Sequence, residues 1–175
     1  QNNNAGASSA YKERIQRLAI GSVLVAQGIP FLHGGSEMKR TKNMDHNSYR
    51  SPDTVNSYKW GWKSTNANMN AMVSKLIAMR KAHPGFRMST WQQVRDNVKS
   101  NQVSASLVST EINGSAVGDS WSKVVVIQNS SGDATVNLPS GNWTVFLEDD
   151  NPNTMTRTVS GSILAKGTAL TILYQ

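Results

Sequence analysis

Hydrophobic residues recur at three- and four-residue spacing in two stretches of the first half of the chain. They are Ile15, Leu18, Ala19, Val23 and Val25 in one stretch, and Met69, Met72, Val73, Leu76 and Ile77, joined by Arg80, in the other. This period is typical of amphipathic helices with one face in a core. The pattern therefore predicts helices over residues 11–27 and 68–83, which end at Gly28 and at the His83-Pro84-Gly85 run.

Between these helices, the apolar run at residues 29–33 predicts a buried strand that ends at Gly34 and Gly35. A strand of a parallel sheet needs neighbours on both sides to satisfy its backbone hydrogen bonds. The order of helix, strand, loop and helix supplies only one such strand. It therefore predicts that residues 1–87 are the last part of a larger barrel or doubly wound sheet, with the rest on another polypeptide or removed.

Beyond Arg87 the pattern changes to short alternating or β-branched runs, which include QVSASLVSTEI, KVVVIQN, WTVFLE and ALTILYQ. Turn-forming sequences such as NSSGD, PSGN and DDNPN separate these runs. This arrangement is typical of an antiparallel β-sandwich. The second predicted domain therefore spans residues 88–175, and Trp121 and Trp143 are expected in or near its core.

Composition and charge exclude several classes of protein. The 175 residues include no cysteine, which excludes disulfides, thiolate zinc sites and a cysteine nucleophile. No stretch approaches about 18 consecutive apolar residues, so no membrane-spanning segment is predicted.

The formal net charge of +7 is unevenly distributed. Residues 1–99 hold 15 Lys and Arg against 5 Asp and Glu, whereas residues 100–175 hold 3 against 6. The positive residues match no nucleic-acid motif, which favours a solvated basic surface over a nucleic-acid partner. A chain that starts at Gln1 without a signal peptide is expected to be processed or cut.

The segment FLHGGSEMKRTKNMDHNSYRSPD, residues 31–53, is dense in side chains that form hydrogen bonds. It follows the predicted strand directly, where α/β barrels place their ligand-binding residues. Its carboxylates, Glu37, Asp45 and Asp53, all lie on one loop, whereas catalytic pairs in barrels come from different strand ends that a rigid scaffold holds apart. No catalytic residue is therefore assigned. The histidines of the segment have no nucleophile or metal ligand at useful spacing, so no metal site is predicted.

The run AQGIPFLHGGSEMKRTK, followed by DHNSYRSPDTVNSYKW and then by LIAMRKAHPGFRM, resembles the C-terminal part of the type I pullulanases. These are debranching enzymes of the α-amylase superfamily of glycoside hydrolases. The resemblance continues through VVVIQNSSGDATVNLPSGNW to TILYQ and so covers essentially the whole chain. It implies an α/β plus all-β fold. Residues 1–87 are then the last part of a (β/α)8 TIM barrel, namely helix 7, strand 8, loop 8 over residues 34–67, and helix 8. Residues 88–175 form an antiparallel β-sandwich.

The resemblance also implies an activity, the hydrolysis of α-1,6-glucosidic linkages in pullulan, glycogen or branched starch with retention at the anomeric carbon. A retaining mechanism needs a carboxylate nucleophile and a carboxylic acid about 5 Å apart. The superfamily places these groups after strands 4 and 5, which are not in this chain. The expected partner is therefore the remainder of the same enzyme, the N-terminal part of the barrel, as a separate chain or fragment, and the isolated chain is expected to be inactive. No cofactor is expected in this segment, although calcium is possible elsewhere in the parent enzyme. The resemblance also implies a bacterial protein that lies outside the cell or on its surface.

Within the loop, the resemblance implies sugar-contacting polar residues, and Asp45, Asn47 and Tyr49 are the predicted substrate-binding residues for an α-glucan. Carboxylate and amide groups suit paired hydrogen bonds to the vicinal hydroxyls of a glucosyl unit. The alternative for Asp45 and Asn47 is a turn in which the Asp or Asn side chain binds nearby backbone. Tyr49 is equally consistent with contact to a sugar and with packing under the loop.

Three further residues of the loop are expected to support it. Glu37 is expected to bind backbone amides or an arginine. Trp60 and Trp62 are expected to pack against the rim of the barrel, in preference to stacking on a sugar ring.

Two alternatives stay open at this point. The chain is also consistent with a non-enzymatic carbohydrate-binding or surface-attachment module whose helical half is a remnant. Within the enzymes, another α-glucan hydrolase such as an isoamylase or amylopullulanase is the second interpretation.

Overall fold

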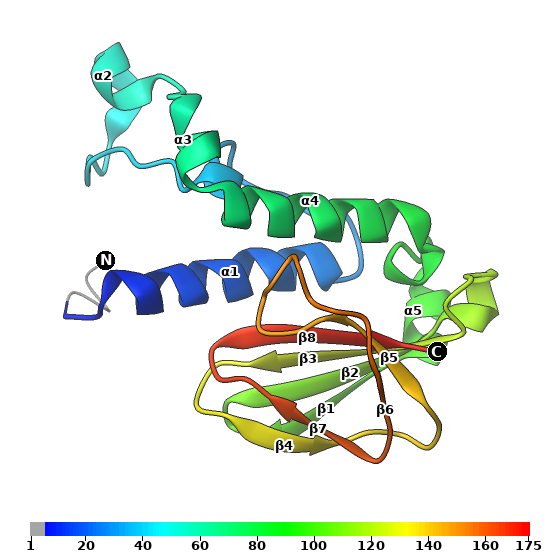
Figure 1. Cartoon of the computed structure of the whole chain (residues 1–175). Helices are drawn as coiled ribbons and strands as arrows, with labels where there is room; N and C mark the ends of the chain where they lie inside the picture. Colours follow the sequence, from blue (N-terminus) through cyan, green and yellow to red (C-terminus); the bar gives the residue numbers. More distant parts are fainter. Residues whose placement is uncertain (1–5) are drawn as a thin grey trace.

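The structure, a computed structural model, describes residues 6–175, so residues 1–5 of the first predicted domain lie outside it. Its helices are α1 (Ser9–Val25), α2 (Asp53–Asn56), α3 (Gly61–Thr65), α4 (Ala67–Ala82) and α5 (Trp91–Asn97), and its 3-10 turns are η2 (Ser36–Met38), η3 (Ser48–Arg50), η4 (Pro84–Phe86) and η5 (Gly114–Val117). The long helices α1 and α4 confirm the two helices predicted from the hydrophobic period. They lie side by side and run in the same direction (Figure 1). None of the described helices is long and apolar enough to cross a membrane.

The strands form two sheets. In spatial order the larger sheet contains β1 (Val98–Ser104), β2 (Leu107–Asn113), β3 (Lys123–Asn129), β8 (Ala169–Tyr174), β5 (Trp143–Leu147) and β6 (Thr158–Val159). The smaller sheet contains β4 (Ala134–Asn137) and β7 (Ser162–Ala165). The paired strands of both sheets are antiparallel, as predicted for this half of the chain. The fold is therefore a pair of long helices combined with antiparallel sheets.

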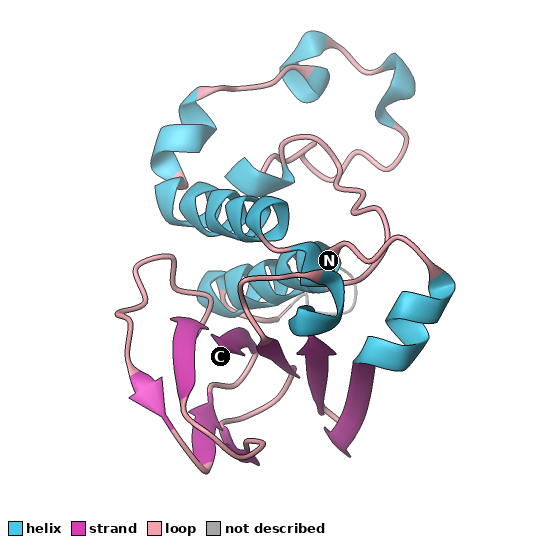
Figure 2. Cartoon of the chain, turned by 90° about the vertical axis from the view of Figure 1, so that its right-hand side faces the viewer, coloured by secondary structure: helices cyan, strands magenta, loops and turns pink. Residues whose placement is uncertain are grey.

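One hydrophobic core joins the long helices to a face of the six-stranded sheet. Leu24 of α1 and Met72 and Leu76 of α4 lie in one buried cluster with Val124 and Val126 of β3. The helix can approach the sheet closely because α1 has a glycine there: a Cβ on the buried Gly21 would lie 2.8 Å from Leu170 Cδ2 of β8. The two long helices form a layer, and the strands lie beneath them (Figure 2).

The opposite face of the same sheet is covered by β4 and β7. Val125 and Ile127 of β3 lie in a second buried cluster with Val136 of β4, Ile163 of β7 and Trp143 of β5. Because successive residues of a strand point to opposite faces, the uninterrupted apolar run of β3 is buried on both sides. The prediction that Trp143 lies in the core is confirmed, at 1% exposure.

The first core contains residues from both predicted domains. It unites α1 and α4 with Phe86, Met88 and the sheet. The helices and the sheet are therefore packed together in this chain, although the predicted boundary between residues 87 and 88 itself stays a prediction.

The predicted strand at residues 29–33 is not formed. These residues have no regular secondary structure, and the side chains of Ile29 and Phe31 are 95% and 88% exposed. A strand forms where a neighbour exchanges backbone hydrogen bonds with it, and no described strand pairs with this segment. The sequence prediction is therefore wrong for this chain taken alone.

Arg80 of α4 joins the two long helices at their C-terminal ends. Its side chain is buried, and its guanidinium donates to the carbonyl oxygens of Leu24 at 3.1 Å, Ala26 at 2.6 Å and Gly28. The last carbonyls of a helix have no partner within it, and a cation there also opposes the negative end of the helix dipole. Arg80 lies in the stripe of α4 predicted from sequence, but Ile77 of that stripe is 42% exposed.

The C-terminal end of α4 is also tied to the β region, through a buried pair of side chains. His83 Nδ1 lies 2.7 Å from Asp119 Oδ1, and the His83 ring stacks on Trp121 with centroids 3.7 Å apart. Asp119 also accepts the backbone N–H groups of Gly85 at 2.8 Å and Trp121 at 2.9 Å. Burial by itself raises the pKa of Asp119, but these hydrogen bonds, above all that from His83, outweigh it and hold the pKa below its ordinary value.

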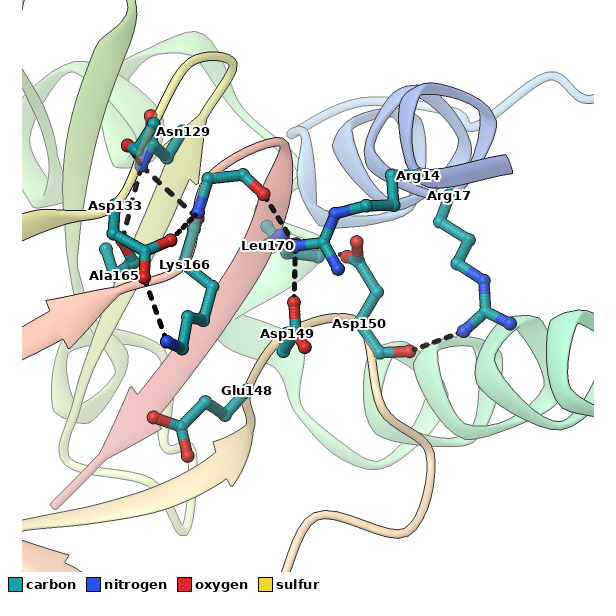
Figure 3. Close-up of polar contacts among 12 residues, drawn as sticks. Arg14, Arg17, Asn129, Asp133, Glu148, Asp149, Asp150, Ala165, Lys166 and Leu170 are labelled. Atoms are coloured by element: carbon teal, nitrogen blue, oxygen red, sulfur yellow. Dashed lines mark hydrogen bonds and ion pairs between the residues drawn. The ribbon is translucent and has the colours of Figure 1, made fainter. Parts of the chain in front are cut away.

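Basic residues of α1 bind the loops at the end of the sheet (Figure 3). Arg14 Nη2 donates to Asp149 Oδ1 and to the Gly167 carbonyl, both at 2.5 Å. Arg17 Nη1 donates to the backbone oxygen of Asp150 at 3.3 Å. The carboxylate of Asp150 accepts the backbone N–H of Leu170 at 2.9 Å.

Asp150 is the most deeply buried carboxylate in these loops, at 2% exposure. Its backbone is left-handed, with φ of 52°. Burial raises its pKa from 3.8 to about 7, although the N–H of Leu170 and the charges of Arg14 and Arg17 act in the opposite direction. The carboxyl group therefore keeps its proton far above the pH at which an exposed aspartate loses it.

We expect Asp150→Asn to change the pH dependence of stability. A carboxyl group whose pKa is raised on folding stabilises the fold fully below its unfolded pKa of 3.8 and loses that contribution as the pH rises through about 7. Asparagine keeps an acceptor for Leu170, tolerates a left-handed backbone and has no charge to bury. The free energy of unfolding of the variant relative to wild type should therefore increase with pH across this window, by on the order of 2–4 kcal/mol.

Urea unfolding at about pH 5 and about pH 8 measures this difference. Asp149→Asn is the matched control, because Asp149 has a similar left-handed φ of 56° but a side chain that is 42% exposed. A difference between Asp150→Asn and wild type that does not grow with pH would contradict the raised pKa.

Candidate functional site

The candidate site lies in residues 34–66, here called the polar arm, which connects the end of the 29–33 segment to α4. The arm contains η2, η3, α2 and α3, and its outer part lies at the end of the molecule away from the sheets (Figure 1). Met38 anchors its base and is 1% exposed, but η3, α2 and α3 contain no buried residue. Hydrogen bonds and ring contacts therefore hold the outer part of the arm in place of a hydrophobic core.

The arm begins at two glycines that other groups approach closely. Gly35 has a left-handed φ of 92°, and a Cβ there would lie 2.7 Å from the side chain of Arg40. A Cβ on Gly34 would clash with Tyr58 Oη. Glu37 Oε2 accepts the N–H of Gly35 at 3.1 Å, so the prediction that Glu37 supports the loop through a backbone amide is confirmed. The glycine pair is thus required by the packing of Arg40 and Tyr58 on the backbone.

Arg40 is the centre of the contacts that cross-link the arm. Its guanidinium donates through Nη2 to the carbonyl oxygen of Asn56 and through Nη1 to that of Gly34 at 3.5 Å. Its Cζ also lies 4.1 Å from the centroid of the Tyr58 ring, a cation–π geometry. The Nε atom of Arg40 is buried and has no hydrogen-bond partner in the described part of the chain.

Asn56 extends these contacts to η3. Its Nδ2 donates to the carbonyl oxygens of Ser48 at 2.7 Å and Ser51 at 2.8 Å. Lys42 Nζ adds a hydrogen bond to Ser48 Oγ at 2.6 Å. The turn that carries Tyr49 is therefore bound from two sides.

Asp45 and Asn47 are brought together by a local turn. Asp45 Oδ1 accepts the backbone N–H of Asn47 at 3.0 Å, and Asp45 Oδ2 accepts the hydroxyl of Ser51. The Asx-turn alternative for Asp45 is thus observed. The hydrogen bond from Ser51, followed by that from Asn47, lowers the pKa of Asp45, so this exposed carboxyl group is ionised at neutral pH.

Asn47 and Tyr49 present their side chains to solvent. The amide group of Asn47 is exposed and makes no hydrogen bond to any described residue. Tyr49 is 73% exposed, and the guanidinium of Arg50 lies 5.3 Å from its ring centroid. In this structure Tyr49 therefore does not pack under the loop.

Trp60 stands out from the arm beside Tyr58. It is 70% exposed, and the two rings stack with centroids 5.7 Å apart. The expected burial of Trp60 is therefore not found within this chain, while Trp62 is half-buried and lies 5.4 Å from Lys59 Nζ.

Sequence reasoning did not single out Arg40, Asn56 or Tyr58. Arg40 and Asn56 lie 16 residues apart, so no local pattern links them. The available signal was the Gly34-Gly35 pair, since adjacent glycines mark backbone that other groups approach closely, but it does not say which groups.

Two of the three carboxylates of the arm, Glu37 and Asp45, bind its backbone amides, whereas Asp53 is exposed. Among residues 6–175, no group of three or more His, Cys, Asp or Glu side chains is placed to hold a metal ion. The arrangement offers an exposed carboxylate, an amide and aromatic rings on one cross-linked segment. These are the groups that form hydrogen bonds and ring contacts with a polar, hydroxyl-rich ligand.

Part of the β region is similar to a known family domain. Residues 94–151 match the family model of the pullulanase all-beta domain. Among individual proteins, the pullulanase of Bacillus subtilis (strain 168) is 33% identical over 123 residues, which cover 70% of this chain and 17% of that protein. The isoamylase of Pseudomonas amyloderamosa is 29% identical over 153 residues, which cover 80% of this chain and 20% of that protein. The chain thus spans about a fifth of the length of these relatives, which are debranching glycoside hydrolases.

Solved structures match both halves of the chain. The pullulanase from Bacillus acidopullulyticus superimposes with a TM-score of 0.93 at 32% identity, covering 98% of this chain and 22% of that one. The pullulanase of Anoxybacillus sp. LM18-11 complexed with maltotriose gives a TM-score of 0.89 at 35% identity, covering 98% of this chain and 24% of that one. The helices, the polar arm and the sheets therefore have counterparts in one region of pullulanase structures.

We expect Gly35→Ala to loosen the base of the arm. A Cβ there meets Arg40, and the left-handed φ of 92° is strained for alanine, at a cost of roughly 1–3 kcal/mol. Hydrogen exchange of the Met38 and Arg40 amides, which both donate to the Gly35 carbonyl, measures the effect and should become faster. Gly61→Ala is the matched control, since a Cβ there meets nothing within 4 Å. Equal protection in the two variants would show that the close packing of Arg40 on Gly35 is not needed.

Proposed function

We propose that this chain is the C-terminal segment of a pullulanase-type debranching enzyme, which hydrolyses α-1,6-glucosidic linkages in pullulan, glycogen and branched starch with retention. The segment supplies the polar arm as one wall of the glucan cleft, together with a stabilising β region. The observation that supports this most is the match to pullulanase structures over 98% of the chain at 32% identity.

The path of the chain between the long helices supports assignment of residues 1–87 to the end of a (β/α)8 barrel. The carbonyl of Gly28 is bound by Arg80 near the C-terminal ends of α1 and α4. The carbonyl of Ser36 accepts Gln16 Nε2 at 3.3 Å, in the N-terminal half of α1. Residues 28–36 therefore run back along two helices that point the same way, which is the course of a barrel strand between its helices. Under the proposal this segment is the eighth strand and forms when neighbouring strands are present.

The exposed groups of the segment fit burial against further parts of the same protein. Ile29 and Phe31 are among the most exposed apolar side chains described, at 95% and 88% exposure. Large apolar side chains in a row on the surface are uncommon without a partner. The proposed partner is the N-terminal part of the barrel.

Within the arm, Asp45, Asn47 and Tyr49 are the proposed contacts to the glucan. The turn occupies each oxygen of Asp45 once, and an ionised carboxylate has about four acceptor positions, so it can also bind sugar hydroxyls. Asn47 contributes a free amide and Tyr49 an exposed ring with a hydroxyl. The local turn and sugar binding are thus compatible functions of the same residues.

Catalysis is assigned to groups outside this segment. The retaining reaction needs a nucleophile and an acid about 5 Å apart on separate strand ends. Glu37 and Asp45 are engaged with the backbone of one arm, so the segment positions substrate while the carboxylates of the remaining barrel cleave it. The isolated chain is accordingly expected to bind glucan weakly and to cleave none.

We expect Asn47→Ala and Asp45→Ala in the full-length protein each to lower kcat/KM on pullulan. Each change removes a hydrogen bond to sugar, a loss of roughly 1–3 kcal/mol in transition-state binding. Asn47→Ala is the more informative variant, because its amide makes no hydrogen bond within the described chain. Asp53→Ala, which removes an exposed carboxylate from the same arm, is the control. Unchanged kinetics in both test variants would assign the arm a purely structural function.

An isoamylase is the second candidate, and the 29% identity to the Pseudomonas amyloderamosa isoamylase over 80% of this chain favours it. Release of reducing ends from pullulan and from glycogen by the full-length protein distinguishes the two. We expect cleavage of pullulan. Cleavage of glycogen alone would favour the isoamylase, and binding without cleavage of either would favour a non-enzymatic carbohydrate-binding module.

A further inference from the structure

We propose that Arg40 is a positioning residue, which holds the segment 45–49 in the geometry that binds glucan. The proposal rests on the proposed function of the polar arm. It extends that function to a side chain that is directed into the arm and is not itself one of the proposed glucan contacts.

A continuous series of contacts leads from the base of the arm to this segment. Arg40 binds the carbonyls of Gly34 and Asn56 and stacks over Tyr58. Asn56 in turn binds the carbonyls on both sides of the η3 turn, those of Ser48 and Ser51.

The series ends at the proposed glucan contacts. The hydroxyl of Ser51 donates to Asp45, and Asp45 accepts the N–H of Asn47. Tyr49 lies between the two carbonyls that Asn56 binds. A displacement of Arg40 therefore acts on the three contacts through Asn56.

Few other forces order this part of the arm. The η3 and α2 elements are three and four residues long and bury no side chain. Nearby Asn43 and Met44 have left-handed φ values of 54° and 66°, which cost energy in non-glycine residues. Without hydrophobic burial, the segment depends on polar cross-links, and Arg40 contributes two hydrogen bonds and a cation–π contact to them.

The chemistry of arginine suits this position better than that of lysine. A planar guanidinium can donate to two carbonyls in fixed directions while its face lies on an aromatic ring. A lysine ammonium keeps the charge but has no planar face or forked donors. Arg40→Lys should therefore recover only part of the function.

Pre-ordering of a binding segment lowers the entropy lost when the ligand binds. Loss of Arg40 should thus weaken glucan binding, and raise KM, with a much smaller effect on kcat, because the reacting carboxylates lie elsewhere. We expect Arg40→Ala to raise KM for pullulan roughly tenfold, and Arg40→Lys to give an intermediate increase.

The test uses the full-length protein with Arg40→Ala, Arg40→Lys and the control Lys63→Ala. Lys63 is an exposed cation on α3 of the same arm, so its loss changes the net charge equally. KM and kcat on pullulan are measured together with hydrogen exchange of the Asn47 and Ser51 amides. The proposal is supported if KM rises and both amides lose protection in the two Arg40 variants, with larger effects in Arg40→Ala than in Arg40→Lys. KM and protection should be unchanged in Lys63→Ala. If Arg40→Ala is not folded, Arg40→Lys is compared with the wild type for the same rise in KM and loss of amide protection.

Three results would overturn the proposal. If the Asn47 and Ser51 amides lose protection in Arg40→Ala but KM is unchanged, the order of the segment does not contribute to glucan binding. If Asp45→Ala also leaves KM unchanged, the proposed glucan site is wrong as well. If protection and KM are unchanged in the Arg40 variants while KM rises in Asp45→Ala, Arg40 has no positioning role and the proposed function stands. A raised KM with unchanged protection means that Arg40 contacts the glucan directly.

Discussion

The arrangement of the helical half depends on the buried guanidinium of Arg80. A cation can be buried only where hydrogen bonds compensate for lost water, and Arg80 finds them in the unpaired carbonyls at the end of α1. The same contacts end α1, hold α4 parallel to it and fix the chain at Gly28, whose φ of 84° allows the turn. The chain then returns along α1, and this return path decides where the polar arm begins.

Two different kinds of interaction stabilise the two ends of the molecule. The helices and sheets share hydrophobic clusters in which Met72, Leu76, Val125 and Ile127 are at 0% exposure. The outer arm has no comparable burial and is held by carbonyl contacts, an Asx turn and stacked rings. Segments of this kind open at lower free energy than packed layers and adapt to ligands more readily, so the rigid layers serve as the support on which the arm can bind.

The match to pullulanases connects this division to function. In a barrel enzyme the ligand-binding residues lie on the loops that follow the strands, while helices and appended domains hold those loops in place. The polar arm follows the segment that runs back between α1 and α4, and the sheets support the two helices from the other side. Under the proposed function, the same chain contributes substrate contacts and stability, and the reacting carboxylates belong to the rest of the enzyme.

The sequence by itself determined the secondary structure of most of the chain and the character of the arm. The three-to-four period predicted α1 and α4, and the β-branched runs predicted antiparallel strands, because local burial patterns follow directly from the geometry of each element. The density of polar side chains indicated residues 31–53 as the candidate site, and the position of its carboxylates on one loop argued against a catalytic pair; both stay predictions.

Tertiary structure alone decided how these parts are joined. The apolar run at residues 29–33 predicted a strand, but strand formation depends on neighbours that no local pattern specifies, and here the run is irregular. The sequence does not explain why a cation, Arg80, lies in the apolar stripe of α4. The structure does, because Arg80 binds the carbonyls at the end of α1. The contact of Arg40 with Asn56 and Tyr58 likewise joins residues with no common period, because hydrogen bonds and cation–π contacts depend on distance in space and not on separation along the chain.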